Sequence, residues 1–125
     1  DPSDPPVYPY DFSQVVEANT LRAEPDTAEF IAPHDGTVRR VILGWPLGTQ
    51  QAVGIGVRGA DRDALIPRGP KDARFIAYDD EVLSFELNES VNKDDSLTFE
   101  FVNNDTESHF VNVDVFFQRG VGDAD

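Results

Sequence analysis

The fold of this chain is decided by the sequence HFVNVDVFFQ, residues 109–118. Apolar side chains recur there at every second position, at Val111, Val113, Val115 and Phe117. The positions between them are Phe110, Asn112, Asp114 and Phe116. A period of two is that of a β-strand, whose successive side chains point to opposite faces. The stretch therefore predicts a long strand with one buried face.

Shorter stretches of the same kind follow one another along the chain, separated by turns rich in Gly, Asn, Asp and Pro. We expect strands at residues 12–18, 28–32, 37–45, 52–58, 74–78, 82–87, 97–102 and 109–118. No segment shows an apolar period of 3.6 residues over three turns. The sequence predicts an all-β fold, a single β-sandwich of jelly-roll type with about eight strands. An Ig-like sandwich is the alternative, against which the absence of Cys argues only weakly.

A length of 125 residues suits one domain with one core. Residues 1–9 hold four Pro and predict an extended N-terminal arm, which either crosses a neighbouring subunit or is a disordered terminus. The sandwich domain is expected at residues 10–119, followed by an acidic tail at residues 120–125. Within it, residues 60–71 predict a loop, and Gly54 and Gly56 leave one face of a strand bare, which suits close backbone approach or a bulge.

Net charge is the most unusual property of the composition. The chain has 24 acidic and 10 basic residues, a formal net charge of −14, with Asp outnumbering Glu two to one and Arg outnumbering Lys eight to two. Such charge destabilises a compact domain in dilute buffer, whereas at about 1 M salt the Debye length falls to about 3 Å. The composition therefore favours a halophilic protein over an ordinary acidic domain.

The sequence argues against two classes of partner. Nucleic acid is not expected, because phosphate binding needs a basic stripe and the Arg residues are scattered among acids. Membrane insertion is not expected either, because no apolar run approaches the 18 or so residues of a spanning helix.

Metal sites have weak support in the sequence. Asp79, Asp80 and Glu81 form an acidic loop cluster that could hold calcium, although they match no EF-hand loop. His34 and His109 lack the spacing of metal ligands, so no metal site is assigned. We expect no cofactor beyond loosely bound sodium, potassium or calcium.

Catalytic motifs are absent from the sequence. No Ser lies in a G-x-S-x-G setting, and Gly54 and Gly56 precede no phosphate-binding Lys, so no enzyme activity is expected. Asn88 and Asn104 each begin an N-glycosylation acceptor pattern in an expected loop.

Aromatic and apolar residues outside the expected core suggest protein interfaces. These candidates are Tyr8, Tyr10, Phe12, Trp45, Leu47, Phe110 and Phe116. Trp45 fits an interface and a core equally well. Phe110 and Phe116 belong to the outward face of their strand, which a second layer or a partner subunit must cover.

Several phrases resemble those of small β-sandwich surface proteins of tailed viruses. They are Thr37-Val38-Arg39-Arg40-Val41, Phe75-Ile76-Ala77-Tyr78-Asp79-Asp80, and the pair formed by residues 98–105 and 109–113. The resemblance implies a capsid decoration, turret or tail-associated subunit that forms symmetric oligomers, and the acidic surface makes the host a halophilic archaeon. It carries over no functional residue.

The expected function is that of a non-enzymatic virion protein at the capsid surface, with copies of itself and capsid proteins as partners. The alternative is a carbohydrate- or receptor-binding module on a virion, on an archaeal cell surface or outside the cell, with a host surface glycan as its ligand. Sandwich loops are suitable places for such a site.

Overall fold

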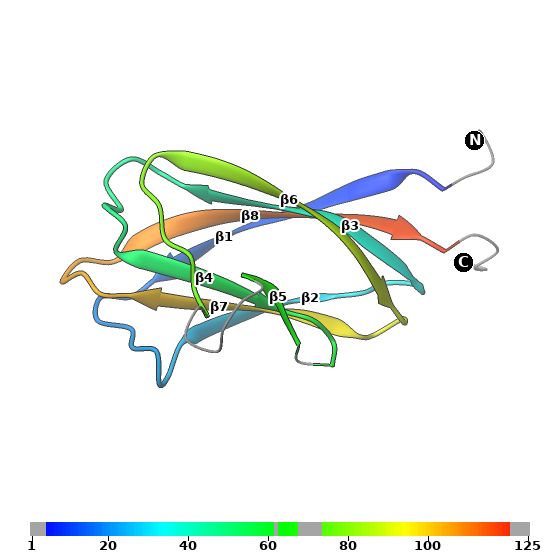
Figure 1. The fold of residues 1–125 in the computed structure, drawn as a ribbon, viewed down its shortest axis with the longest axis horizontal. Helices are drawn as coiled ribbons and strands as arrows, with labels where there is room; N and C mark the ends of the chain where they lie inside the picture. The colour runs from blue at the N-terminus through cyan, green and yellow to red at the C-terminus, as the bar shows by residue number, and fades with distance from the viewer. Residues whose placement is uncertain (1–4, 62, 68–73, 121–125) are drawn as a thin grey trace.

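The computed structural model describes residues 5–61, 63–67 and 74–120, which form eight β-strands and no helix (Figure 1). The strands are β1 (Val7–Val16), β2 (Asp26–Ile31), β3 (Gly36–Trp45), β4 (Val53–Arg58), β5 (Ala64–Ile66), β6 (Glu81–Val91), β7 (Ser96–Asn103) and β8 (His109–Arg119). Sheet I has the order β1-β8-β3-β6, and sheet II has the order β2-β7-β4-β5. The two sheets form the two layers of a sandwich.

Strand pairing shows that the sandwich is a jelly roll. β4 pairs with β5, β3 with β6, β2 with β7 and β1 with β8, all antiparallel, so the chain is one long hairpin rolled up on itself. This nested order confirms the predicted jelly roll. The Ig-like alternative is wrong, because Ig strands are ordered differently within their sheets.

The core lies between the inner faces of the two sheets. β7 contributes Leu97, Phe99 and Phe101, all fully buried, and β8 contributes the alternating row from Val111 to Phe117. Burying each such side chain stabilises the fold by about 1.5–3 kcal/mol. The period-two pattern of residues 109–118 is thus confirmed as the signature of a strand with one buried face.

β1 begins earlier than the sequence indicates. Val7 to Pro9 pair with β8, so from Val7 onward the segment expected to be a separate arm belongs to sheet I. Pro9 has no backbone N–H to donate. It is tolerated because β1 is an edge strand, whose open side needs no hydrogen bond to a neighbouring strand. Of the remainder of the arm, residues 5–6 precede β1, and residues 1–4 lie outside the described residues, as do residues 121–125 of the predicted tail.

The region between β4 and β6 also differs from expectation. β5 occupies Ala64–Ile66, inside the expected loop. Conversely, the strand expected at residues 74–78 is reduced to one bridge, in which Ile76 exchanges two backbone hydrogen bonds with Ile55.

Gly54 and Gly56 allow this bridge to form. A Cβ added at Gly54 would lie 2.9 Å from the Phe75 Cβ atom, and one at Gly56 would collide with the Arg74 carbonyl oxygen. The backbone of residues 74–75 therefore lies directly on the bare face of β4, as the sequence predicts.

Candidate interaction surfaces

The outer face of sheet I is an uncovered surface with apolar corners. β8 turns Phe110 and Phe116 to this face, where Phe110 is 49% exposed and Phe116 is half-buried. Val15 of β1 lies opposite Phe110 and is 56% exposed. The described chain has two layers only, so none of it covers this face (Figure 1).

Leu47 extends this apolar corner. It lies in the loop after β3 and is 78% exposed. Together with Val15 and Phe110 it lines a hollow of about 300 Å³. Val82, at the start of β6 and also strongly exposed, adds a further apolar side chain to the same face.

A second hollow, of about 390 Å³, lies at the centre of the face above Gly44, whose missing side chain opens it. Asp11 of β1 and Asp114 of β8 stand directly opposite each other on its rim. Like charges in this position repel each other. Beside them, Ser13 Oγ donates a hydrogen bond of 2.6 Å to Asn112 Oδ1.

The far end of the face is basic and aromatic. Arg40 lies over the Phe116 ring, with the guanidinium carbon 5.8 Å from the ring centroid, and forms an exposed ion pair of 2.8 Å with Glu86. Arg39 donates a hydrogen bond from Nε to Gln118 Oε1. A hollow of about 270 Å³ lies between these side chains. Arg39 and Arg40 thus lie about two residues along the strand from the neighbouring carboxylates of Asp11 and Asp114.

Trp45 does not belong to this surface. It is 2% exposed, its Nε1 donates a hydrogen bond of 2.9 Å to the Val53 carbonyl oxygen, and its ring packs on Tyr78. Of the two interpretations left open by the sequence, the structure therefore selects the core.

The N-terminal aromatics point toward the inner side of the sandwich. Tyr10 packs on Phe30 with ring centroids 5.3 Å apart, and Phe12 packs edge-on against Phe99 at 5.5 Å. Phe12 is half-buried, so it works mainly as a core residue. Tyr8 and Tyr10 are 56% and 40% exposed, because they lie where the sandwich opens at its edge.

A pocket of about 320 Å³ lies beside these tyrosines. Tyr8, Tyr10, Pro5, His34 and Arg119 are among the residues that line it. Two phenol rings next to a cation and an imidazole provide both apolar faces and hydrogen-bonding groups.

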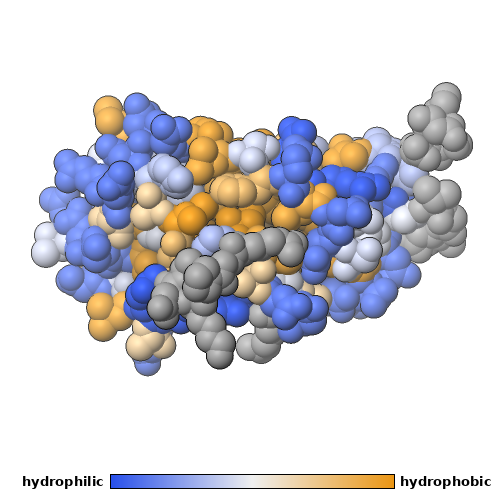
Figure 2. Space-filling view, viewed as in Figure 1, coloured by the Kyte–Doolittle hydropathy of each residue, from blue (hydrophilic) through white to orange (hydrophobic). Residues whose placement is uncertain are grey.

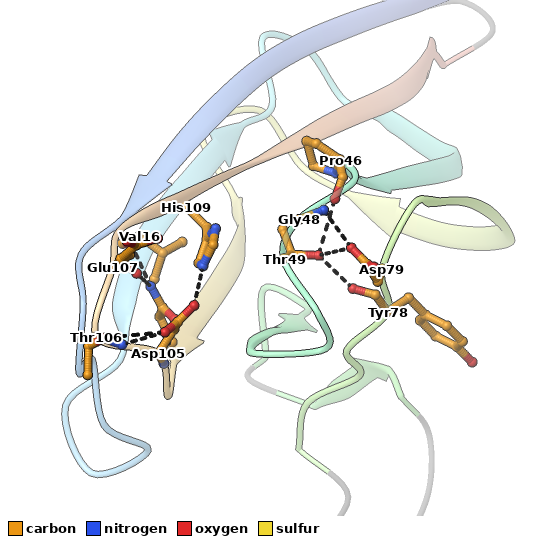
Figure 3. A network of polar contacts seen from close by, with 11 residues as sticks. Val16, Pro46, Gly48, Thr49, Tyr78, Asp79, Asp105, Thr106, Glu107 and His109 are labelled. Carbon is orange, nitrogen blue, oxygen red and sulfur yellow. Dashed lines mark hydrogen bonds and ion pairs between the residues drawn. The ribbon is translucent and has the colours of Figure 1, made fainter.

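The acidic cluster at Asp79 serves to join two loops. Asp79 Oδ1 accepts hydrogen bonds from the Gly48 N–H at 2.9 Å and from the Thr49 hydroxyl at 3.3 Å, and the Thr49 hydroxyl also donates to the Tyr78 carbonyl oxygen (Figure 3). Backbone N–H groups, first that of Gln50 and then that of Gly48, lower the pKa of Asp79 against the opposing effect of burial.

Calcium at Asp79, Asp80 and Glu81 gains no support from this geometry. Among the described residues, no three His, Cys, Asp or Glu side chains are grouped so that they could hold a metal ion. The three residues are adjacent in sequence, but the Asp79 carboxylate is directed at the neighbouring loop.

A second polar network supports the turn between β7 and β8. Asp105 Oδ2 lies 2.7 Å from His109 Nε2, and Asp105 Oδ1 accepts a hydrogen bond from the Thr106 N–H (Figure 3). The hydrogen bonds from His109 and Thr106 lower the pKa of Asp105. In the described part of the chain no Ser or Thr hydroxyl is hydrogen-bonded to this histidine, so the pair lacks the nucleophile of a hydrolase triad.

The two glycosylation candidates lie in different settings. Asn104 is exposed in the turn after β7, as expected. Asn88 lies within β6 and not in a loop, and its Oδ1 accepts a hydrogen bond of 2.8 Å from Arg39. The expected loop position of Asn88 is therefore wrong.

Glu100 anchors the segment that covers sheet II. Arg58 Nε and Arg74 Nη2 bind its carboxylate at 2.9 and 3.2 Å. Burial alone would raise the pKa of Glu100, but these two hydrogen-bonded cations outweigh it and lower the pKa below its ordinary value. Arg74 also lies over the Phe75 ring, 5.1 Å from its centroid.

Sequence reasoning missed the polar half of the sheet I face. Arg39, Arg40, Asp11 and Asp114 come from three strands that are distant in sequence, and only the register brings them together. The alternation of β8 places Asp114 outward, but nothing in the sequence indicates that β1 and β3 flank it.

No family model matches the sequence, and neither does any curated protein. Among solved structures, the chain is similar to the capsid of cyanophage Pam1, with a TM-score of 0.51 and 14% identity over 94% of this chain and 87% of that one. It is also similar to the Tobacco streak virus coat protein, with a TM-score of 0.48 and 10% identity over 90% and 86% of the two chains.

A serine protease of Aeromonas sobria matches 90% of this chain with 27% of its own length, at a TM-score of 0.49 and 10% identity. At such identities a likeness shows the fold alone. The chain therefore has a viral capsid-like jelly-roll fold. In its described part, no helix is long and apolar enough to cross a membrane.

Proposed function

We propose that this chain is a non-enzymatic structural protein of a virus particle. The observation that carries the proposal is the nested jelly-roll order of this chain, together with its structural similarity over 94% of its length to a chain of the cyanophage Pam1 capsid. The polar clusters at Asp79, Asp105 and Glu100 support it, because each joins parts of the chain and leaves no obvious acid, base or nucleophile for catalysis.

The particle that we propose is that of a tailed virus with a halophilic archaeal host. The net charge of −14 supports this host, because concentrated salt screens such self-repulsion far more strongly than dilute buffer does. The chain would serve as a decoration, turret or tail-associated subunit at the capsid surface. It would need no cofactor, and sodium, potassium or calcium would sit loosely around its carboxylates.

Mass spectrometry of particles banded in a high-salt density gradient tests this function. We expect the chain in purified particles at a fixed ratio to the major capsid protein, and antibody labelling at the particle surface. Its absence from intact particles, with presence in the free cell envelope, would exclude the virion role.

Self-association in a symmetric oligomer is part of the proposal. Because acidic copies repel one another, we expect assembly to weaken below about 1 M salt, where the Debye length grows past about 3 Å. Light scattering after size exclusion over a salt series measures this. An oligomer that is indifferent to salt would contradict the electrostatic argument.

A second candidate function is binding of a host glycan or receptor, and the pocket beside Tyr8 and Tyr10 favours it. Exposed aromatic rings next to hydrogen-bonding groups suit a sugar, which has apolar faces and polar edges. A glycan array in high salt tests this function, with Tyr8→Ala expected to abolish any signal and Leu47→Ala, remote from the pocket, to preserve it. No signal above background for the wild type would remove this candidate.

A further inference from the structure

We infer that the outer face of sheet I binds the same face of a second copy across a two-fold axis that crosses the strands. The inference rests on the proposed function and names the surface through which copies associate. It is carried by the charge, the shape and the size of this face.

Acidic side chains largely avoid this face. The described residues include nineteen acids and seven basic residues, a balance of −12. The outer face of sheet I holds Asp11, Glu86 and Asp114 against Arg39 and Arg40, a balance of −1. The remaining acids lie mostly in the loops, and hydrophilic side chains gather at both ends of the molecule (Figure 2). A second copy therefore meets little net repulsion here.

The outer face of sheet II also holds few acids, but the chain covers its middle. Phe75 and the Arg74 backbone lie on Gly54 and Gly56, and Arg74 is tied down by Glu100. The hollow over Gly44 in sheet I has no such cover from the described residues. This contrast makes sheet I the face that is open to a partner.

The charges on the open face are arranged to complement a rotated copy. Arg40 pairs in register with Phe116, and Ile42 pairs with Asp114, so the cations and the carboxylates are two residues apart, about 7 Å. A two-fold axis passing between these rows pairs each strand with its own symmetry mate. It therefore brings Arg40 of each copy, whose guanidinium lies over the Phe116 ring, opposite Asp114 of the other. Asp114, which Asp11 repels, then gains a cation as neighbour, twice per dimer.

The apolar side chains follow the same rotation. The axis brings the corner formed by Val15 and Phe110 of one copy to the opposite end of the partner's face, next to the row in which Val7, 43% exposed, pairs with Gln118. Each apolar corner is then covered by the far end of the partner's face, while the charges meet at the centre. The contact is isologous, because each patch is used once by each copy.

The face is large enough for such a contact. Ten-residue strands extend over about 33 Å, and four strands cover about 19 Å in width, so each copy offers about 600 Å². Two copies together would bury about 1,200 Å², the lower end of the range for specific interfaces.

Reciprocal charge reversal tests the inference. One variant carries Arg39→Glu and Arg40→Glu, and the other carries Asp11→Arg and Asp114→Arg. The face of the first variant is then wholly acidic, and that of the second is basic except for Glu86. We therefore expect each variant alone to self-associate more than about tenfold more weakly than the wild type. An equimolar mixture should form heterodimers with at least the wild-type affinity, because the acidic face of one variant meets the basic face of the other.

These affinities are measured by sedimentation equilibrium at about 1 M salt, where only charges in contact interact strongly. Circular dichroism checks that both variants are folded. Variants that associate as the wild type does, or a mixture that fails to restore association, would overturn the inference. The mixture is the decisive sample, since a folding defect in either variant cannot produce recovery.

Cross-linking gives an independent readout, because the chain has no Cys. Ser84→Cys lies on this face in the row of Asp114, close to the proposed axis, and a short bismaleimide should link it to its symmetry mate. Thr27→Cys, equally exposed on β2 of sheet II, is the matched control and should remain monomeric. Equal cross-linking at the two positions would contradict the inference.

The proposed function and this inference fail in different ways. If the chain is absent from particles but the two charge-reversed variants associate with each other, the proposed function is wrong and the inferred interface stands. If the chain is present in particles but Ser84→Cys gives no cross-link and the mixture does not restore association, the proposed function stands and the inferred interface is wrong.

Discussion

Gly56 is a position in β4 against which the backbone of residue 74 lies directly. Its missing Cβ leaves room for the Arg74 carbonyl oxygen, which belongs to a segment held by Glu100 and by the bridge between Ile55 and Ile76. The constraint is steric and involves backbone, so the neighbour cannot move aside as a flexible side chain would.

We predict that Gly56→Ala destabilises the fold by about 1–3 kcal/mol, through displacement of the Arg74 backbone. Chemical unfolding in high salt measures the change. Gly44→Ala is the control, because its nearest neighbour, the Asn112 Cβ atom, is 3.6 Å away, an ordinary contact. Equal costs at both glycines would show that the collision with the Arg74 backbone does not determine the effect.

Asp105 makes the stability of the β7–β8 turn depend on pH. Its folded pKa is lowered, so its contribution is complete above the unfolded value of about 3.9 and is lost as pH falls through the folded value. We predict that Asp105→Asn lowers the melting temperature at pH 7 and that the difference from the wild type shrinks as the pH falls below the unfolded pKa of about 3.9.

Thermal unfolding between pH 7 and pH 2.5 measures this difference. Asp94→Asn, which removes an exposed carboxylate of the same charge, is the control and should give no pH-dependent gap. A gap for Asp105→Asn that persists in acid would show that packing of the side chain, and not its charge, matters.

Residue environments could be predicted where they depend on alternation and not where they depend on loops. The inward and outward sides of β8 follow from its sequence. By contrast, Trp45 and Leu47 are two residues apart, yet Trp45 is buried and Leu47 is exposed. Trp45 is buried because the Val53 carbonyl oxygen and Tyr78 meet it there, and Leu47 is exposed on the loop. Neither partner is close enough in sequence to reveal this.

At the scale of the element, the β7–β8 turn depends on one buried amide. Asn103 is fully buried, its Nδ2 donates to the carbonyl oxygens of Val16 and Glu107 at 3.0 and 2.9 Å, and its Oδ1 accepts from the Asp105 N–H at 3.0 Å. The end of β1 and both sides of the turn are thereby joined.

We predict that Asn103→Ala destabilises the protein by about 2–4 kcal/mol, because three backbone groups lose their partner in a buried place. Asn104→Ala, at the exposed neighbouring position, should cost less than about 0.5 kcal/mol. Chemical unfolding of both variants gives the comparison. Similar small costs at both positions would mean that water replaces the buried amide.

Elements were predictable in proportion to their length and alternation. β3, β7 and β8 have clear patterns and were expected close to their observed bounds. β5 has three residues, too few for a period to show, and it exists because β4 offers an open edge. β1 extends through Pro9 because it is an edge strand, a property of sheet order that no local pattern contains.

At the scale of the whole molecule, the strand order comes from contacts between distant parts of the chain. β1 pairs with β8, about a hundred residues away, and the sheet I face combines residues of both. The jelly roll could be favoured from strand count and turn spacing. The register that places Arg40 beside Phe116 and Asp11 beside Asp114 could not, since alternation fixes only the side on which a residue lies.

The acidic loops make stability of the whole molecule depend on salt. Most carboxylates of the described residues lie in the loops, where they repel one another across solvent. Hydrophilic side chains gather at both ends of the sandwich (Figure 2). The Debye length is about 10 Å at 0.1 M salt and about 3 Å at 1 M, so this repulsion falls steeply over that range and little beyond it. We predict that the melting temperature of the chain rises strongly up to about 1 M salt and then more slowly.

A variant with four exposed acids neutralised separates this repulsion from the general strengthening of apolar burial by salt. Glu17→Gln, Glu24→Gln, Asp94→Asn and Glu107→Gln remove charge from loops at both ends of the sandwich. In differential scanning calorimetry this variant should melt above the wild type at 0.1 M salt, and the two curves should converge above about 1 M. Parallel curves would instead show that salt acts on the core of both proteins alike. Repulsion between the acidic side chains would then not be the cause of the salt dependence, and these side chains would serve to hydrate the surface.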